Sequence, residues 1–405
     1  MVSIGRWRNW SLTLSIKQTS VTVSLSQGNN FRVYSFDLAG RWWTAMIDGV
    51  SYRRGLNGRV VAKWFIGKEL RDRKWLSETE AQELEISIRS EFVILVSDLS
   101  FHLAELHPKP SNPDLDLLKS IANYSISDSQ IDINKHSQVY RPIGILPPDQ
   151  YMAVVLQATE GCSFNNCTFC TFYQDRPFRI KSQKEFKEHI HSVKHYLGSG
   201  LNLRRTIFIG DANALVVPMK LMVPMLELVN DHFDVDEIGG IFAFLDGFSG
   251  DKKSAKDYKI LNNLGVKRVY IGLESGNERL LKFLNKPGKP SDVLHAVRAI
   301  KSGGISVGII LLLGAGGRSY STDHIKDSVS IINQMNLDLD DLIYFSELIV
   351  NEGTEYSLNA YQANLIPLTD KEKSEQAEKI ESGFHFSSQA GNPHISRYDI
   401  REFVY

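Results

Sequence analysis

Residues 152–173, which read MAVVLQATEGCSFNNCTFCTFY, join an apolar run to a loop that carries every cysteine of the chain. The run Met152-Ala-Val-Val-Leu156 is typical of a buried strand, and the loop after it holds Cys162, Cys167 and Cys170. In α/β folds, ligands bind in loops outside the carboxyl ends of parallel strands. This stretch therefore predicts a parallel sheet with a ligand site at the end of one strand.

Three clustered thiolates without a fourth cysteine suit a 4Fe–4S cluster, because they hold three irons and leave the last iron open to a small molecule. A plant-type ferredoxin cluster begins with the same spacing but needs another cysteine further on. Zinc on three cysteines and one histidine is an alternative, with His189 or His191 as the fourth ligand. A non-catalytic iron–sulfur protein of electron transfer is a second alternative. Disulfides are disfavoured because three is an odd number.

Two short motifs, Thr159-Glu-Gly-Cys162 and Cys167-Thr-Phe-Cys170, frame the loop, and the aromatic Phe169 precedes the last cysteine. Together they resemble the cluster loop of the radical S-adenosylmethionine (SAM) superfamily. The commonest loop of that family has three residues between the first two cysteines, whereas this chain has four. The resemblance implies a 4Fe–4S cluster on Cys162, Cys167 and Cys170, with SAM as the second cofactor and Phe169 beside it.

That resemblance also implies an activity. The enzyme is expected to cleave SAM reductively at a single cluster to a 5′-deoxyadenosyl radical, which abstracts hydrogen from an organic substrate. A low-potential electron donor such as a flavodoxin or ferredoxin is the implied partner. The chain has no second set of cysteines for an auxiliary cluster, which argues against sulfur-inserting and methylthio-transferring relatives. Oxidoreductase, lyase and isomerase reactions all stay open.

Two further segments are candidates for binding SAM, on the strength of the resemblance. Gly210-Asp211-Ala-Asn213 closes an expected strand and is similar to the family's amine-binding segment; a turn capped by Asp211 or Asn213 is the alternative. Glu274 and Ser275 resemble the ribose-contacting segment, where Glu274 can accept hydrogen bonds from two ribose hydroxyls and Ser275 can donate to a carboxylate.

Five more residues have weaker assignments. Lys286 lies where some relatives pair a basic residue with the SAM carboxylate. Gly308 and Leu313 belong to an expected strand on which a glycine lets the backbone approach adenine closely. Arg176 and Arg179 follow the cysteine loop and can neutralise a cluster or substrate anion, although surface charge explains them equally well.

The first 75 residues differ in composition from the rest. They hold 13 lysines and arginines against 4 acidic residues, and all six tryptophans of the chain. Interleaved aromatic and basic residues, with Arg53 and Arg54 as examples, can bind RNA or an anionic small molecule. The alternative is that the tryptophans form the core of a small module. An RNA-modifying radical SAM enzyme therefore stays open as a function.

Length and composition indicate a globular protein. The chain has 405 residues, of which 42% are hydrophobic and 23% charged. No apolar run is long enough to predict a membrane span, and the first residues lack a signal-peptide core. We expect a cytoplasmic protein, in which clustered thiols stay reduced.

Periodicity predicts four regions. Residues 1–107 form a β-rich module that starts with a hairpin and ends with a helix from Ser77, and residues 108–147 form a linker. Residues 148–350 alternate six strands with helices, which predicts a partial (β/α)6 TIM-like barrel, the core of the radical SAM superfamily. Residues 351–405 form a C-terminal helix and a tail, and we expect the tail to pack back on the barrel or the module.

Overall fold

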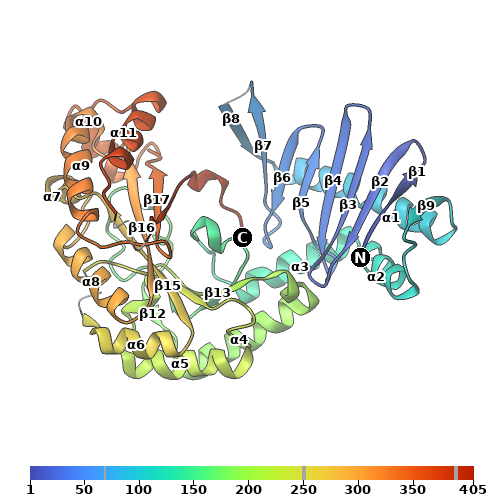
Figure 1. The fold of residues 1–405 in the computed structure, drawn as a ribbon, viewed down its shortest axis with the longest axis horizontal. Coiled ribbons are helices and arrows are strands. Elements are labelled where there is room, and N and C mark those ends of the chain that lie inside the picture. Colours follow the sequence, from blue (N-terminus) through green and yellow to red (C-terminus); the bar gives the residue numbers. More distant parts are fainter. Residues whose placement is uncertain (68–69, 249–251, 387–390) are drawn as a thin grey trace. The chain divides into compact units, whose positions relative to one another are not determined.

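The computed structural model describes residues 1–67, 70–248, 252–386 and 391–405. The chain divides into two compact units (Figure 1). The N-terminal unit comprises residues 1–143, 191–205 and 402–405, and the barrel unit comprises residues 144–190 and 206–401. None of the helices in the described ranges is long and apolar enough to cross a membrane.

The N-terminal unit is built on a nine-stranded antiparallel sheet with the order β8-β7-β6-β5-β4-β3-β2-β1-β9. Its strands are β1 (Val2–Trp7), β2 (Trp10–Ile16), β3 (Ser20–Gln27), β4 (Asn30–Asp37), β5 (Trp42–Ile47), β6 (Val50–Arg54), β7 (Val60–Ile66), β8 (Leu70–Trp75) and β9 (Ala104–His107). The expected hairpin is confirmed as β2 and β3, in which Leu14 lies opposite Val23. Apolar residues alternate with serine and threonine along both strands, so only one face of the sheet is apolar.

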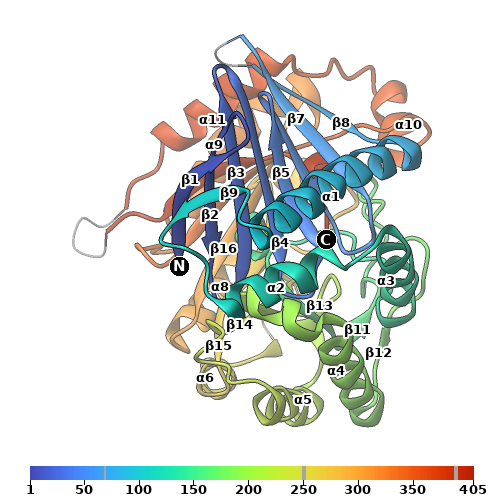
Figure 2. The same ribbon diagram turned by 90° about the vertical axis from the view of Figure 1, so that its right-hand side faces the viewer.

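Helices cover that apolar face. Figure 2 shows α1 (Glu78–Ser100) and α2 (Asn112–Ala122) on the same side of the sheet. Ser77 and Glu80 form the expected capping box at the start of α1, and Ile88, Phe92 and Leu95 pack into one core with the strands. Helix α1 ends at Ser100 and β9 follows, so the module of residues 1–107 ends with a strand and not with the expected helix.

The segment interpreted as a linker, residues 108–147, contains two helices, α2 and α3 (Ile126–Val139). Capping boxes start both helices, from Ser111 to Asp114 and from Ser125 to Asp128. These two signals were present in the sequence, because a serine precedes an acidic residue by three positions in each case.

The barrel unit contains a parallel sheet of seven strands in the order β10-β13-β14-β15-β16-β17-β18. The strands are β10 (Ala153–Gln157), β13 (Thr206–Gly210), β14 (Ile241–Leu245), β15 (Val266–Glu274), β16 (Ser306–Leu313), β17 (Leu342–Glu347) and β18 (His394–Tyr398). The first six are the predicted strands, and the α/β partial barrel is confirmed. In the described part of the chain β10 and β18 do not pair, so hydrogen bonds do not close the barrel.

The seventh strand, β18, comes from the tail. It pairs in parallel with β17, with Tyr398 beside Ser346, and so extends the sheet beyond the predicted six strands. The expectation that the tail packs back is therefore confirmed for residues 394–398.

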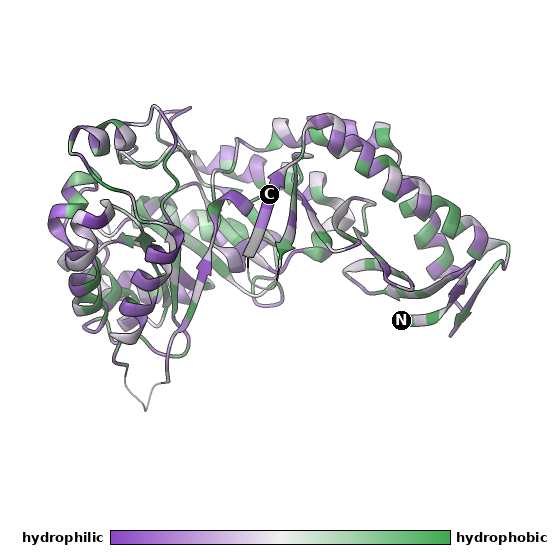
Figure 3. Cartoon of the chain, turned by 90° about the horizontal axis from the view of Figure 1, so that it is seen from above, coloured by the Kyte–Doolittle hydropathy of each residue, from purple (hydrophilic) through white to green (hydrophobic). Residues whose placement is uncertain are grey.

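Helices surround the parallel strands. They are α4 (Gln183–Leu197), α5 (Met219–His232), α6 (Ala255–Asn263), α7 (Glu278–Phe283), α8 (Pro290–Ser302), α9 (Gly317–Ile332), α10 (Glu355–Gln362) and α11 (Asp370–Ser382). Residues of α4 from position 191 onward are counted with the N-terminal unit. The helices carry both hydrophilic and hydrophobic residues in Figure 3, as helices with one buried face do.

A polar network occupies the amino-terminal end of the barrel strands. Asp149 accepts hydrogen bonds from the hydroxyl groups of Tyr270 and Tyr344, the second at 2.8 Å, and pairs with Arg268 at 3.3 Å. In barrels of parallel strands the active site lies at the opposite, carboxyl edge, where it is built from the loops that follow the strands.

Candidate functional site at the carboxyl edge of the barrel

The cysteine loop, residues 161–173, lies at the carboxyl edge of the barrel sheet. It follows β10 and lies between β11 (Thr159–Glu160) and β12 (Arg179–Ile180), two short strands that pair in antiparallel orientation. Since all seven barrel strands are parallel, Gly210, Glu274 and Leu313, which end β13, β15 and β16, lie at this same edge.

The start of the loop is fixed by Asp211. Its Oδ2 accepts a hydrogen bond from the backbone N–H of Gly161 at 2.9 Å, and its Oδ1 accepts one from Nε2 of Gln157 at 2.7 Å. Gly161 has a φ of +78°, and a Cβ there would lie 3.0 Å from the carbonyl oxygen of Pro177. Burial raises the pKa of Asp211, against the effect of these hydrogen bonds. Both carboxylate oxygens of Asp211 are thus engaged with the chain.

The additional residue between Cys162 and Cys167 is accommodated at Asn165. Its φ is +53°, a left-handed conformation that asparagine tolerates better than most residues. Its Nδ2 donates to the carbonyl oxygen of Tyr173 at 2.8 Å, which closes the loop across its base. The signal for this turn in the sequence is the asparagine pair at positions 165–166.

The peptide unit between the last two cysteines is held from both sides. The backbone N–H of Thr168 donates to the carbonyl oxygen of Leu284 at 3.0 Å, and the Thr168 carbonyl accepts from the N–H of Tyr356 at 3.1 Å. The N–H of Cys170 donates to the Cys167 carbonyl at 3.2 Å, which makes a tight turn. Two segments distant in sequence therefore clamp this part of the loop.

The three cysteines are free thiols of intermediate exposure. Burial raises the pKa of the Cys167 thiol to about 12, and the neighbouring ammonium of Lys286 opposes that rise. Burial also raises the pKa of Cys170, and the charges of Cys162 and Glu274 act in the same direction. The structure thus brings all three thiols together beside Glu274 and Lys286.

Glu274 and Lys286 form an ion pair with 2.7 Å between Oε1 and Nζ. Burial alone would lower the pKa of Lys286, but the nearby charges of Glu274 and Cys167 raise it overall. Glu274 adopts a φ of +59°, a conformation that is costly for a residue with a side chain and is often associated with functional sites. Tyr398 on β18 also interacts electrostatically with Glu274.

Ser275 turns away from this pair. Its hydroxyl is fully buried, lies 2.7 Å from Nδ1 of His324, and accepts from the N–H of Asn277 at 3.0 Å. Burial lowers the pKa of His324 to about 4, so the ring is neutral at pH 7. These contacts indicate that Ser275 shapes the turn after β15, and its proposed contact with SAM stays a prediction.

Asp246, which the sequence analysis did not identify, joins the site together with Asn213. Asp246 follows β14, and its backbone N–H donates to Oδ1 of Asn213 at 2.9 Å, while Nδ2 of Asn213 donates to Asp246. Nδ2 of Asn213 also donates to the hydroxyl of Ser163, next to Cys162, at 2.8 Å. The signal for Asp246 was the one that pointed to Glu274, namely a polar residue that closes an apolar strand.

The remaining SAM candidates have packing roles in the structure. A Cβ at Gly308 would lie 2.4 Å from the ring of Tyr270, so this glycine makes room for a tyrosine. Leu313 is buried at the end of β16, and Phe169 packs against a small core that includes Leu312. Contacts of these residues with SAM stay predictions.

The arginines proposed for anions are mostly paired. Arg176 lies beside Asp211 with 3.6 Å between Nε and Oδ2, and Arg179 pairs on the surface with Glu160 and Glu185. In the N-terminal unit, Arg54 is buried, donates to the hydroxyl of Ser129 at 2.7 Å, and lies 3.6 Å from Glu85.

Arg53 is half-buried on β6. Its side chain belongs to the face opposite Arg54, since successive side chains of a strand alternate. Arg53 and Arg54 both belong to the N-terminal unit, whereas the cysteine loop belongs to the barrel unit.

The donor set fits an iron–sulfur cluster. Three thiols converge on one loop, and between the last two lies Thr168, whose side-chain oxygen is buried without a hydrogen-bond partner in the described structure. Within the described ranges, no group of three or more histidine, cysteine, aspartate and glutamate side chains is arranged to hold a single metal ion. His189, considered above as a zinc ligand, accepts a hydrogen bond at Nε2 from the backbone N–H of Gln157 at 3.0 Å, which occupies one of its two ring nitrogens.

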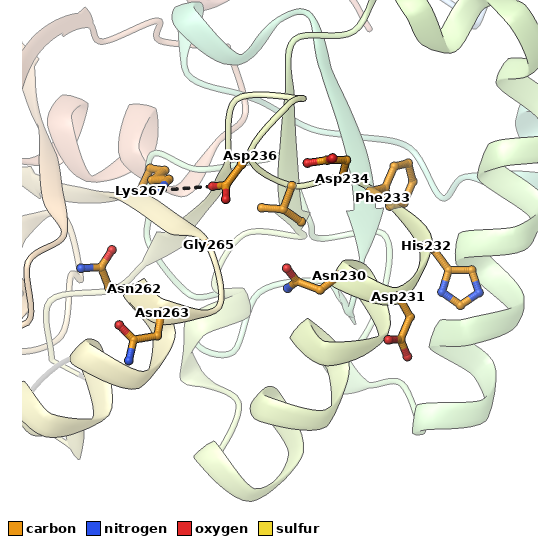
Figure 4. A pocket seen from close by; sticks show the side chains of 11 residues that line it. Asn230, Asp231, His232, Phe233, Asp234, Asp236, Asn262, Asn263, Gly265 and Lys267 are labelled. Atoms are coloured by element: carbon orange, nitrogen blue, oxygen red, sulfur yellow. Dashed lines mark ion pairs between the residues drawn. The ribbon is translucent and has the colours of Figure 1, made fainter.

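A pocket of about 660 Å³ lies elsewhere, at the amino-terminal ends of β14 and β15. Its lining comes from the ends of α5 and α6, the loops after them and the start of β15, and Figure 4 shows Asp236 paired with Lys267. The distance between Oδ1 of Asp236 and Nζ of Lys267 is 3.7 Å. It contains none of the candidate residues above, so it is separate from the cysteine site.

Comparison with known proteins identifies one family. Residues 156–329 match the family model of the radical SAM superfamily. No curated protein matches the chain.

Several solved structures are similar at low identity. Coproporphyrinogen III oxidase (HemN) from Escherichia coli, described as a radical SAM enzyme, is 11% identical with a TM-score of 0.42, over 60% of this chain and 54% of that protein. Methylornithine synthase (PylB) is 15% identical with a TM-score of 0.39, over 73% and 76%. SuiB from Streptococcus suis, solved with S-adenosylmethionine, is 12% identical with a TM-score of 0.41, over 87% and 72%. These TM-scores are below 0.5, so the similarity to these structures carries no argument about the function of this chain.

Proposed function

We propose that this chain, whose residues 156–329 match the radical SAM family model, is a radical SAM enzyme, and that Cys162, Cys167 and Cys170 hold its single 4Fe–4S cluster. With SAM bound, such a cluster supplies the electron that cleaves SAM to a 5′-deoxyadenosyl radical, which takes hydrogen from an organic substrate. The observation that carries the proposal is the convergence of three thiols beside a buried Glu274–Lys286 pair at the carboxyl edge of a parallel sheet.

The residues around the cysteines have distinct roles in this proposal. Asp211 positions the loop through Gly161, and Asn165 closes its base. Lys286 holds one oxygen of Glu274, so the carboxylate is oriented for hydrogen bonds from ribose hydroxyls at its other oxygen. A buried, pre-oriented carboxylate loses little entropy when it binds, which favours affinity.

Asp246 is the acidic group that we assign to the ammonium of SAM. Asp211 is less suited to that role, because its two carboxylate oxygens already accept hydrogen bonds from Gln157 and Gly161. Asp246 stands next to Asn213 and near Lys286 at the same edge.

The substrate we propose is a small organic molecule. RNA is less well supported, because Arg54 and Trp42, which belong to the basic and aromatic segment that suggested it, are buried in the core of the N-terminal unit. We further propose a flavodoxin or ferredoxin as the electron donor, and a cytoplasmic location, where clustered thiols stay reduced.

The test is SAM cleavage by the anaerobically reconstituted protein with reduced flavodoxin, followed as 5′-deoxyadenosine by chromatography. The wild type should form 5′-deoxyadenosine, and the Cys162→Ala, Cys167→Ala, Cys170→Ala triple variant should form none. Asp175→Asn, a change at an exposed carboxylate near the loop, is the matched control and should keep the activity. A wild type that binds a full cluster but leaves SAM intact under these conditions would contradict the proposal.

A further inference from the structure

One hydroxyl in the cysteine loop, that of Thr168, has no hydrogen-bond partner among the described residues. Thr168 lies between Cys167 and Cys170 and is only 4% exposed. Its Oγ1 is buried, and no atom of the described residues forms a hydrogen bond with it. A buried hydroxyl without a partner destabilises a fold, and native proteins rarely retain one unless a group outside the chain uses it.

The hydroxyl cannot easily reach another partner by moving the backbone. The N–H of Thr168 is bonded to Leu284 at 3.0 Å and its carbonyl to the N–H of Tyr356 at 3.1 Å, so its peptide groups are held on both sides. The side chain has one rotatable bond to its hydroxyl-bearing carbon, and β-branching restricts that bond further. The position of Oγ1 is therefore set by the loop and by the two segments that clamp it.

The residues next to Thr168 in the chain suggest which group its hydroxyl binds. Cys167 directly precedes it, and Cys170 follows two residues later in the tight turn closed by the Cys170 N–H and the Cys167 carbonyl. Sulfur atoms of an iron–sulfur cluster accept hydrogen bonds, and such bonds help to set its reduction potential.

We propose that Thr168 Oγ1 donates a hydrogen bond to a sulfur atom of the bound cluster and thereby raises its reduction potential. The inference rests on the proposed function, because it requires the cluster on these cysteines. The physical reason for the direction is electrostatic: a donor hydrogen stabilises the more negative, reduced cluster more than the oxidised one. Thr168 is thus a positioning and tuning residue, and it takes no direct part in the chemistry.

Three single variants test this. Thr168→Val keeps the β-branched shape and removes only the hydroxyl, and Thr168→Ser keeps the hydroxyl. Thr171→Val makes the same chemical change three residues later in the same loop, where the side chain is exposed. The primary measurement is the midpoint potential of the reconstituted cluster, titrated anaerobically and followed by electron paramagnetic resonance.

We expect Thr168→Val to shift the potential to more negative values, while Thr168→Ser and Thr171→Val stay close to the wild type. A second measurement uses the apoprotein: Thr168→Val should raise its thermal unfolding midpoint, because a buried hydroxyl without a partner is replaced by a methyl group. In the loaded protein the same change should speed the loss of iron to a chelator by roughly tenfold, which is about the effect of one hydrogen bond.

The outcomes separate this inference from the function on which it rests. An unchanged potential in Thr168→Val, or an equal shift in Thr171→Val, overturns the role of Thr168 even if the cluster assembles normally. A wild-type protein that assembles no iron–sulfur cluster overturns the proposed function itself.

Discussion

The sheet of the N-terminal unit and the carboxyl edge of the barrel both gather charged side chains, but they use them in different ways. In the N-terminal unit, Arg41 is 6% exposed, donates from Nε and Nη2 to Asp132 at 2.7 and 2.8 Å, and lies 3.3 Å from Asp37. At the barrel edge, Lys286 pairs with Glu274 at 2.7 Å and stands beside the thiols of Cys167 and Cys170.

The difference separates structural charges from functional ones. A charge network whose members satisfy one another inside a core specifies a fold, whereas a buried charge beside reactive groups at strand ends is available for a ligand. Composition alone could not separate these cases, because it does not show which charged side chains pair with one another inside a core.

The largest effect is expected at Arg41. Arg41→Ala leaves Asp132 buried without its partner, which should lower the free energy of unfolding of the N-terminal unit by about 3–5 kcal/mol. Urea unfolding followed by tryptophan fluorescence measures this, because all six tryptophans lie in residues 1–75. Arg8→Ala removes a pair whose arginine is 58% exposed and should cost about 0–1 kcal/mol. Equal losses of unfolding free energy in the two variants would contradict the structural role assigned to the buried Arg41 network.

The pH dependence of stability tests the burial of His136 in the same unit. Burial lowers the pKa of His136 to about 4, whereas an unfolded histidine titrates near 6.5. Between these values the unfolded chain binds the extra proton, so stability is highest above pH 6.5 and falls as the pH drops towards 4, by roughly 3 kcal/mol. His136→Gln should flatten this part of the fluorescence-monitored stability profile. A slope identical to the wild type would show that His136 is not the group responsible.

Glu274 tests the assignment of the barrel edge as a ligand site. Glu274→Gln should leave the cluster and the fold of the N-terminal unit intact but weaken SAM binding by about tenfold to a hundredfold, the effect of losing charge-assisted hydrogen bonds worth roughly 1.5–3 kcal/mol. Isothermal titration of SAM into the reconstituted protein measures the affinity. Glu278→Gln, an exposed neighbour on α7, is the control. Unchanged affinity in Glu274→Gln would remove this residue from the site.

Asp211 should have the smallest effect. Asp211→Asn keeps one acceptor oxygen and loses the other, so the side chain can no longer accept from both Gly161 in the loop and Gln157 on β10, a loss worth about 1–3 kcal/mol. The cluster should still assemble but release iron to a chelator faster than the wild type. Release at the wild-type rate would mean that the loop does not depend on Asp211.

The fold was predictable wherever the sequence pattern is local. Apolar runs bounded by polar turns predicted six of the barrel strands, and the serine-led capping pattern predicted the start of α1. The seventh strand was not identified, because His394-Ile-Ser-Arg-Tyr398 is short, has only partly buried side chains, and pairs with a strand about 50 residues earlier. Helices α2 and α3 were missed for a different reason, since proline residues before them suggested a linker.

The site was predictable in its chemistry but less so in its geometry. Cysteine spacing identified the three thiols, and polar residues at strand ends identified Glu274. Which carboxylate is engaged by the chain depends on side-chain directions, so the sequence did not distinguish Asp211 from Asp246. The burial of Arg54 likewise depends on which face of β6 it occupies, and Glu85 and Ser129, its partners there, lie far along the chain.

The most direct measurement is the iron and acid-labile sulfide content of the full chain after anaerobic reconstitution. The account predicts about four irons and four sulfides per chain in the wild type, as a 4Fe–4S cluster requires, and neither in the Cys162→Ala, Cys167→Ala, Cys170→Ala triple variant. Stoichiometric zinc without labile sulfide in the wild type would contradict it.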